Sequence, residues 1–321
     1  MDFNLTETQA SWQSKAVAFA SSLAASEAKE VVARAGQAAL IQPDADLLAA
    51  AVVVDAVAWE SAAAAITLAL HTGVVMGLGD DARAGALVRG EMVGAIALSS
   101  EDLPSPQNGR LHGRASWVAP LADRGVAIVG VRAGSGVEAA AVELDSPGVT
   151  CEPVESAALS GLICGHVRFD GAEFTAMGAT TPSMTRVRVL LAAAALGMGR
   201  RALHEALSVA RGHTGRGAGG EQTVQGLLAD SATELDAAKL LTWKAASSRA
   251  PSLADASMAK LAATDATQRA VARATQVVGG DSFRSGHIVE RLAQDVRALE
   301  LFAGRTEALR EAVALETLPP G

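Results

Sequence analysis

The sequence lacks the residue groupings that build the commonest self-contained active sites. Its two cysteines, Cys151 and Cys164, fit neither a metal-ligand spacing nor a disulfide framework, and they indicate buried thiols in a reducing compartment. The six histidines are scattered, with no pair three or four residues apart, so a metal site is not expected. No Walker loop and no G-x-S-x-G segment is present. The chemistry therefore needs a cofactor or a partner chain.

Clusters of positive charge and long uncharged apolar runs are also missing. The net charge is -8 and no basic run occurs, so nucleic acid is not an expected partner. The longest apolar runs, near 52–70 and 187–199, contain charged residues, which is typical of core helices rather than membrane spans. The opening residues are polar and acidic and show no signal-peptide pattern. We therefore expect a soluble cytoplasmic protein.

Residues 1–93 are predicted to form a helical domain. Thr6 is a candidate N-cap, with Glu7 in the first turn of the helix that follows. A second, Ala- and Val-rich helix is expected to start at Asp44 and to break between Gly73 and Gly79. A short helix over 82–89 completes this part.

Residues 94–177 are predicted to form a β domain, either a barrel or a sandwich. Here the apolar runs become short, and Pro, Gly, Asp and Asn separate them. The runs are GAIALSS, RLHGRASWV, GVAIVGVRA, EAAAVEL, GVTCEPV and HVRFDGAEF. Such spacing favours an all-β unit. The segment GSGVEA at Gly134 resembles part of a dinucleotide fingerprint, but a second strand follows it at once, which excludes a βαβ unit.

Residues 178–321 are predicted to form a four-helix bundle. Long apolar-faced segments follow Pro182, the Gly-rich loop GRGAGGE, and Pro251, and only short loops join them. The predicted fold class is therefore multi-domain α+β: a helical domain, a β domain and a helical bundle in that order.

Four stretches of the sequence resemble one enzyme family. They are the opening MDFNLTETQ, the segment GEMVGAIALSSEDL, the helix RVRVLLAAAALGMGRRALHEAL, and the C-terminal QVVGG followed by HIVERLAQDVRALELFAG. In this order and spacing they are similar to the acyl-CoA dehydrogenases. The resemblance implies an FAD cofactor, an acyl-CoA substrate, and electron transfer to an electron-transferring flavoprotein.

In that family a carboxylate removes a proton next to the thioester carbonyl while a hydride passes to the flavin. The resemblance places the family's glutamate at Ala303, between Phe302 and Gly304. Some members carry the base on the first bundle helix instead, and that position is Val187; the adjacent Arg188 matches a family arginine. A general base contributes about 10²–10⁴-fold to the rate, so neither position supplies a group that the reaction needs.

The same resemblance implies which residues contact the flavin and its nucleotide part. The tryptophan of the family's ring-contacting strand matches Trp117, for which a core position is the alternative. The neighbouring loop, SSEDLPSPQN, is shortened, and the motif that grips the other subunit's pyrophosphate becomes HTGRG. QVVGG is intact, with an ordinary helix–helix turn as the alternative. The predicted cofactor-binding residues are Trp117, Arg211, His213, Arg216, Gln276, Gly279 and Gly280.

The missing parts belong to a subunit's own active site, and the retained parts belong to its neighbour's flavin. This pattern resembles the short, base-less chain of actinobacterial heterotetrameric acyl-CoA dehydrogenases, which are associated with steroid side-chain degradation. The resemblance then implies a second, catalytic chain as partner. Three alternatives stay open: a different acid such as Glu300 or Glu307 acts as base, the chain is a flavin-dependent monooxygenase of the same superfamily, or it is a structural pseudoenzyme.

Overall fold

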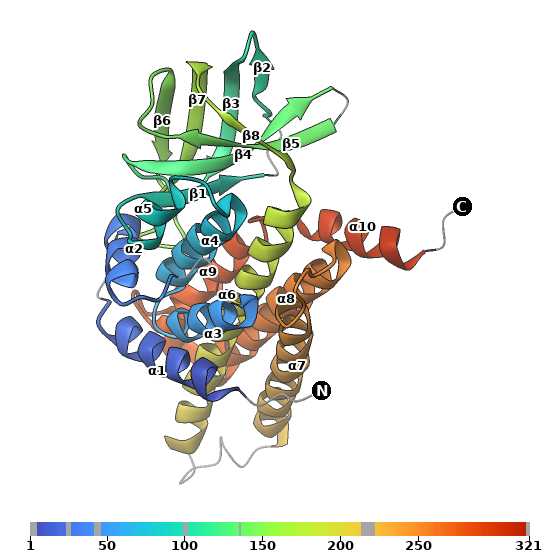
Figure 1. Cartoon of the computed structure of the whole chain (residues 1–321). Helices are drawn as coiled ribbons and strands as arrows, with labels where there is room; N and C mark the ends of the chain where they lie inside the picture. Colours follow the sequence, from blue (N-terminus) through green and yellow to red (C-terminus); the bar gives the residue numbers. More distant parts are fainter. Residues whose placement is uncertain are drawn as a thin grey trace.

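The computed structural model describes residues 5–23, 27–41, 46–98, 102–134, 136–212 and 222–318. A β sandwich lies at one end of the molecule, and the N-terminal and C-terminal helices pack together beneath it (Figure 1). One continuous apolar core joins the two helical parts, and a second core lies between the sheets. The predicted α+β architecture is confirmed.

The helices described before the sandwich are α1 (Glu7–Ser21), α2 (Ala28–Gln37), α3 (Leu47–Ala58), α4 (Ala62–Leu78) and α5 (Ala84–Val88). Thr6 is the N-cap of α1 as predicted, and its hydroxyl accepts a hydrogen bond from the backbone N–H of Gln9 at 3.3 Å. Asp44 lies outside the described residues. Asp46 is the N-cap of α3, because its carboxylate accepts hydrogen bonds from two backbone N–H groups of the first turn.

The second predicted helix is wrong in two respects. It is divided into α3 and α4 at Trp59, because Ser61 caps a new helix and accepts a hydrogen bond from the N–H of Ala64 at 3.2 Å. The expected break at Gly73 does not occur, and α4 continues to Leu78. Gly73 is needed for packing instead: a Cβ at this position would lie 2.4 Å from Cγ2 of Val187 on a neighbouring helix.

In the described part of the sandwich, the six predicted strands are present together with two further short ones. They are β1 (Val93–Ala97), β2 (Ser105–Gln107), β3 (Arg110–Val118), β4 (Gly125–Ala133), β5 (Gly136–Glu143), β6 (Val149–Val154), β7 (Cys164–Ala172) and β8 (Thr175–Ala179). One sheet has the order β1-β4-β5-β8 and the other β2-β3-β7-β6. Strands β4 and β5 form an antiparallel hairpin around the GSGVEA segment, so this segment is not a nucleotide loop.

Within its described residues, the C-terminal part has three long helices and two shorter ones rather than four long ones. They are α6 (Thr181–Gly212), α7 (Gln222–Ala246), α8 (Leu253–Val278), α9 (Ile288–Leu299) and α10 (Thr306–Thr317), with a 3-10 turn at Gly279–Phe283. Helix α6 crosses the middle of the molecule and packs on both helical parts (Figure 1). Within the described ranges no helix is both long and apolar enough to cross a bilayer. The domain boundaries at 93 and 177 stay predictions.

A buried histidine fastens the sandwich to the helices. His71 on α4 is fully buried, and its Nδ1 accepts a hydrogen bond from Gly94 N–H on β1 at 2.8 Å. Its Nε2 lies 3.1 Å from the carbonyl oxygen of Leu87, to which it donates because Nδ1 is the acceptor. Burial lowers the pKa of His71 to about 4, so the ring is neutral at pH 7 and fixed in one tautomer.

Candidate functional site

The connection between α9 and α10 adopts a backbone conformation that its sequence does not favour. Ala303 has φ of +54° and Gly304 has φ of +112°. The left-handed region costs a non-glycine residue about 1–3 kcal/mol, so surrounding contacts must hold the loop in place.

Two cations from different helices hold this loop by its carbonyl groups. Arg188 on α6 donates from Nε to the carbonyl oxygen of Ala303 at 2.9 Å, and from Nη1 to Oγ of Ser257 at 2.8 Å. Lys260 on α8 donates from Nζ to the carbonyl oxygen of Gly304 at 2.9 Å. The sequence resemblance pointed to Arg188 but missed Lys260 and Ser257. A single lysine on the apolar, Ala-rich face of α8 was the available signal.

Both cations are buried without a carboxylate hydrogen-bonded to them in the described part of the chain. Lys260 has 0% and Arg188 has 5% of its surface exposed. Burial and the nearby Arg188 charge lower the pKa of Lys260 to about 7, which Glu300 only partly offsets. Burial also lowers the pKa of Arg188 to about 10. The site is therefore a positively charged frame around a loop that carries no acid.

The second family base position is closed by packing. Val187 is fully buried on α6 and contacts α4 where Gly73 gives it room. Of the two substitute acids considered, Glu307 is exposed on α10, and Glu300 ends α9 with its carbonyl oxygen 3.5 Å from Nζ of Lys260. Neither forms a hydrogen bond to the Ala303 loop. The geometry thus offers no carboxylate at either family position.

Trp117 is exposed on the sandwich, so the alternative of a core tryptophan is wrong. The side chain is 59% exposed, and the backbone φ is +57° at a bulge of β3 between Ala115 and Val118. One edge of the indole meets His166, with ring centroids 5.8 Å apart and planes at 67°. The remaining indole surface is free to stack on a planar ring.

The QVVGG segment forms an open edge at the end of α8. Gln276 is exposed, and Gly279 ends the helix with φ of +72°. A Cβ at Gly279 or Gly280 would have no atom of the described residues within 4 Å. Arg211 lies in the last turn of α6, whereas His213 and Arg216 lie outside the described residues. A backbone this open can be approached closely by a ligand.

The structure separates the predicted residues into groups. Lys260 and Gln276 stand about 24 Å apart along α8, at a rise of 1.5 Å per residue. The Ala303 loop and the QVVGG edge therefore do not form one site within this chain. Within the described residues no three His, Cys, Asp or Glu side chains come together to hold a metal ion.

Known proteins of one enzyme family are similar to parts of this chain. Residues 177–318 match the family model for the acyl-CoA dehydrogenase C-terminal domain. The chain is 36% identical over 132 residues to the short-chain specific mitochondrial acyl-CoA dehydrogenase of Bos taurus, which is 40% of this chain and 32% of that protein. It is 29% identical over 262 residues to benzylmalonyl-CoA dehydrogenase of Aromatoleum aromaticum, which is 71% of this chain and 69% of that one.

The C-terminal part of the chain is similar to the acyl-CoA dehydrogenases. Its fold matches the solved structure of butyryl-CoA dehydrogenase from Megasphaera elsdenii with a TM-score of 0.88 and 21% identity, over 99% of this chain and 100% of that chain. The chain spans about a third of the length of the bovine relative. The similarity to the mitochondrial enzymes covers less than half of this chain, while the fold extends over all of it.

FAD is the cofactor that these acyl-CoA dehydrogenase relatives indicate. Two observations on this chain fit it. The indole of Trp117 is exposed where a flavin ring could stack, and the glycines of the QVVGG edge leave open space for a nucleotide. The Ala303 loop fits the cofactor's chemistry less well, because it holds no proton acceptor.

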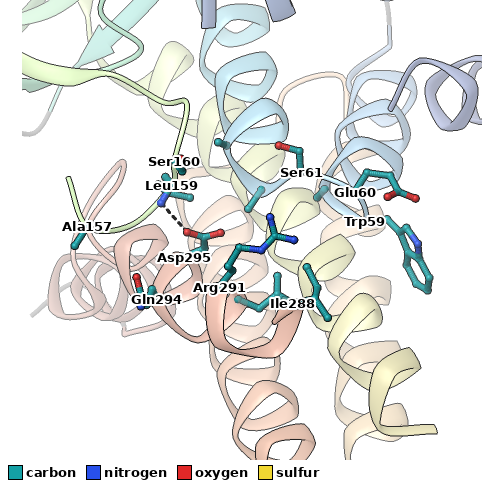
Figure 2. A pocket seen from close by; sticks show the side chains of 14 residues that line it. Trp59, Glu60, Ser61, Ala157, Leu159, Ser160, Ile288, Arg291, Gln294 and Asp295 are labelled. Atoms are coloured by element: carbon teal, nitrogen blue, oxygen red, sulfur yellow. Dashed lines mark hydrogen bonds between the residues drawn. The ribbon is translucent and has the colours of Figure 1, made fainter. Parts of the chain in front are cut away.

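A small cavity elsewhere includes none of the predicted site residues. It has a volume of about 110 Å³ and lies between the α3–α4 turn, the β6–β7 loop and α9. Figure 2 shows Asp295 of α9 next to the backbone of Leu159, whose N–H donates to Oδ1 at 2.6 Å. Burial raises the pKa of Asp295. This bond joins α9 to the sandwich and has a structural role.

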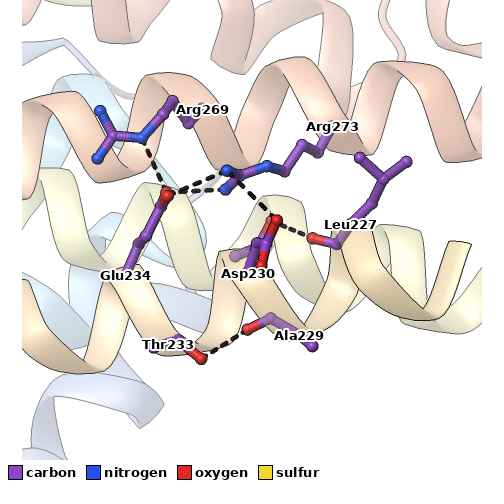
Figure 3. Close-up of polar contacts among 8 residues, drawn as sticks. Leu227, Ala229, Asp230, Thr233, Glu234, Arg269 and Arg273 are labelled. Atoms are coloured by element: carbon purple, nitrogen blue, oxygen red, sulfur yellow. Dashed lines mark hydrogen bonds and ion pairs between the residues drawn. The ribbon is translucent and has the colours of Figure 1, made fainter. Parts of the chain in front are cut away.

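An ion-pair network fixes α7 against α8 close to the QVVGG edge. Glu234 on α7 accepts hydrogen bonds from both Nη atoms of Arg273, at 2.8 and 3.0 Å, and from Nε of Arg269 at 2.8 Å (Figure 3). The bonds from Arg273 are the main cause of a Glu234 pKa lowered to about 2. Arg273 lies one turn before Gln276, so the network supports the open end of α8.

Proposed function

We propose that this chain is the base-less subunit of a heteromeric, FAD-dependent acyl-CoA dehydrogenase, and that it completes the flavin site of a second, catalytic chain. The observation that carries the proposal is the contrast within one fold. The loop at Ala303 is held firmly but has no acid, whereas the QVVGG edge is open and structurally supported.

The missing acid determines which of the two chains carries out each step of the reaction. Dehydrogenation of an acyl-CoA removes a proton from the carbon next to the thioester carbonyl, and bound FAD takes up the hydride from the neighbouring carbon. In this chain the first step has no acceptor, because Ala303 and Val187 cannot bind a proton. We therefore assign the acyl-CoA and the proton transfer to the partner chain, and reoxidation of the flavin to an electron-transferring flavoprotein.

The residues of this chain serve the cofactor in our proposal. The open backbone at Gly279 and Gly280 lets the nucleotide part of the partner's FAD approach closely, and the Gly280 N–H and the amide of Gln276 contact it. Arg211 or Arg216 supplies positive charge towards its pyrophosphate, and His213 stands at the position of the family's arginine. Trp117 stacks against a flavin ring at the sandwich.

The test compares the purified chain alone with the chain co-expressed and co-purified with an acyl-CoA dehydrogenase chain that keeps the catalytic glutamate. Flavin absorbance and enoyl-CoA formation with an artificial electron acceptor are measured for both samples. We expect full flavin content and turnover only for the complex. Full flavin content with enoyl-CoA formation by the lone chain would sink the proposal.

Two other outcomes would replace it by a different function. Oxygen consumption by the lone chain with reduced flavin would indicate a monooxygenase. Absence of flavin from every complex that contains this chain would indicate a structural pseudoenzyme.

A further inference from the structure

The small cavity beside α9 has no role in the proposed flavin site. Its volume is about 110 Å³, and its walls come from the α3–α4 turn, the β6–β7 loop and the first two turns of α9 (Figure 2). A cavity of about 150 Å³ is large enough to bind benzene. The space beside α9 therefore suits a molecule of about five non-hydrogen atoms.

Asp295 of α9 presents one free carboxylate oxygen to this cavity. Its Oδ1 accepts a hydrogen bond from the backbone N–H of Leu159 at 2.6 Å, whereas Oδ2 accepts none from a described residue. Leu159 is buried, so the carboxylate lies against a fixed wall. Burial raises the pKa of Asp295, and the charge of Arg291 offsets this only in part. A positive group bound at Oδ2 would therefore stabilise the carboxylate.

Arg291 is the one cation among the described residues that line the cavity, and it is not paired with Asp295. The two residues are four apart on α9, so their side chains leave the same face of the helix. Figure 2 shows Arg291 extending from α9 towards Ser61 at the start of α4. Glu60, the other acid of the lining, lies at the end of the cavity beside Trp59. One positive and one negative group thus face the same space without neutralising each other.

The start of α4 forms the wall towards which Arg291 points. Ser61 caps this helix of 17 residues, and Ala62 and Ala63 line the cavity. Backbone N–H groups in the first turn of a helix have no partner within the helix, and those of Ala62 and Ala63 have no acceptor among the described residues. Arg291 and these donors are suited to a carboxylate, whereas Oδ2 of Asp295 is suited to an ammonium group.

We propose that this cavity binds a small zwitterion of the α-amino acid type. The ammonium group of the ligand donates to Oδ2 of Asp295, and its carboxylate accepts hydrogen bonds from Arg291 and from the first turn of α4. Because both side chains leave one face of α9, a single small molecule can reach them together. The proposal requires neither bound flavin nor catalysis, so it can fail or stand independently of the proposed function.

The experiment measures binding to the full-length chain by isothermal titration calorimetry at pH 7. The probes are glycine and L-alanine, together with acetate and methylammonium, which each carry only one of the two charges. We expect saturable binding of at least one amino acid and about tenfold weaker binding, or less, of acetate and methylammonium. Asp295→Asn and Arg291→Gln should each weaken binding of the amino acid about tenfold.

Arg297→Gln is the matched control. Arg297 is an exposed arginine of the same helix and does not line the cavity, so this variant should bind like the wild type. Absence of saturable binding of both amino acids overturns the proposal, and so does binding of acetate or methylammonium as tight as theirs. Equal affinity of Arg291→Gln and Arg297→Gln, with unchanged melting temperatures, overturns it as well. This comparison holds even if Asp295→Asn weakens the fold, because Arg291 is exposed and its replacement should not unfold the chain.

Discussion

Helix α8 has opposite environments at its two ends. Near its start, Lys260 is completely buried and binds the carbonyl group of Gly304, so the Ala303 loop has a fixed conformation. At its far end, Gln276 is exposed, and no described atom would meet a side chain at Gly280. The first region is closed to solvent and held in one conformation, whereas the second is open to solvent and accessible to a ligand.

The groups that hold the Ala303 loop in place differ from the group that a reaction would need there. Arg188 and Lys260 bind backbone oxygens of the loop rather than a carboxylate, so the loop keeps its conformation although it carries no acid. Loss of the acid therefore leaves the fold intact. The open end contributes little to the core, so its glycines are better explained by a ligand than by packing.

Removal of Lys260 should have the largest effect. Lys260→Ala deletes a fully buried side chain and leaves the Gly304 carbonyl without its donor. We expect a loss of about 3 kcal/mol in the free energy of unfolding, measured by urea denaturation. Lys244→Ala is the control, because Lys244 is half exposed and paired with Asp255, and its denaturation midpoint should stay close to that of the wild type. Similar losses in both variants would contradict a closed frame at Ala303.

Identical substitutions at two glycines compare the ends directly. In Gly304→Ala the new Cβ would lie 2.9 Å from Nη2 of the buried Arg188, at a φ of +112° that alanine disfavours. The expected cost is about 2–3 kcal/mol. Gly280→Ala meets open space, and its melting temperature should stay within about 2 °C of the wild type. A strong loss in Gly280→Ala would mean that the open edge is structural.

Stability should increase with pH between 7 and 9. The folded pKa of Lys260 is about 7 and its ordinary value is 10.5, so in this window the unfolded chain retains a proton that the folded chain has lost. Raising the pH therefore favours the folded state, by about 2 kcal/mol over the two units. Lys260→Met should remove this increase, and Lys244→Met should retain it. The chain has no tyrosine, but burial raises the pKa of both cysteines, so their deprotonation in the unfolded chain offsets part of this increase, and the difference between the wild type and Lys260→Met isolates the lysine. The same profile in the wild type and in Lys260→Met would contradict the buried, partly neutral lysine.

Local patterns predicted the parts of the fold that depend on neighbours in sequence. Thr6 was predicted as a cap from the residues that follow it, and six strands were predicted from alternation and turn residues. Short β2 and β8, with sequences SPQ and TAMGA, lack that pattern. The expected break at Gly73 was wrong because its small size serves a contact with α6, which is distant in sequence.

The candidate site was predicted only in part for the same reason. The family resemblance identified Ala303 and Arg188. The hydrogen bond from Lys260 to Gly304 joins residues far apart in sequence, so no local sequence pattern predicts it. The exposure of Trp117 depends on a β-bulge, which the alternation of β3 does not predict. Positions 213 and 216 lie outside the described residues, so their part in phosphate binding stays a prediction.

The smallest expected effect concerns the support of the open end. Glu234→Gln keeps the size of the side chain but removes the charge that holds Arg269 and Arg273 (Figure 3). Because the network lies near the surface, the free energy of unfolding should fall by less than about 1 kcal/mol at pH 7. Glu311→Gln, which changes an exposed acid on α10, is the control. If the network positions the end of α8, the complex with the catalytic chain should lose flavin severalfold faster on dilution in Glu234→Gln than in the control. Equal rates of flavin loss would mean that the network is a surface ion pair without a role in flavin binding. Gly279 and Gly280 would then be the residues at the end of α8 to test for nucleotide binding.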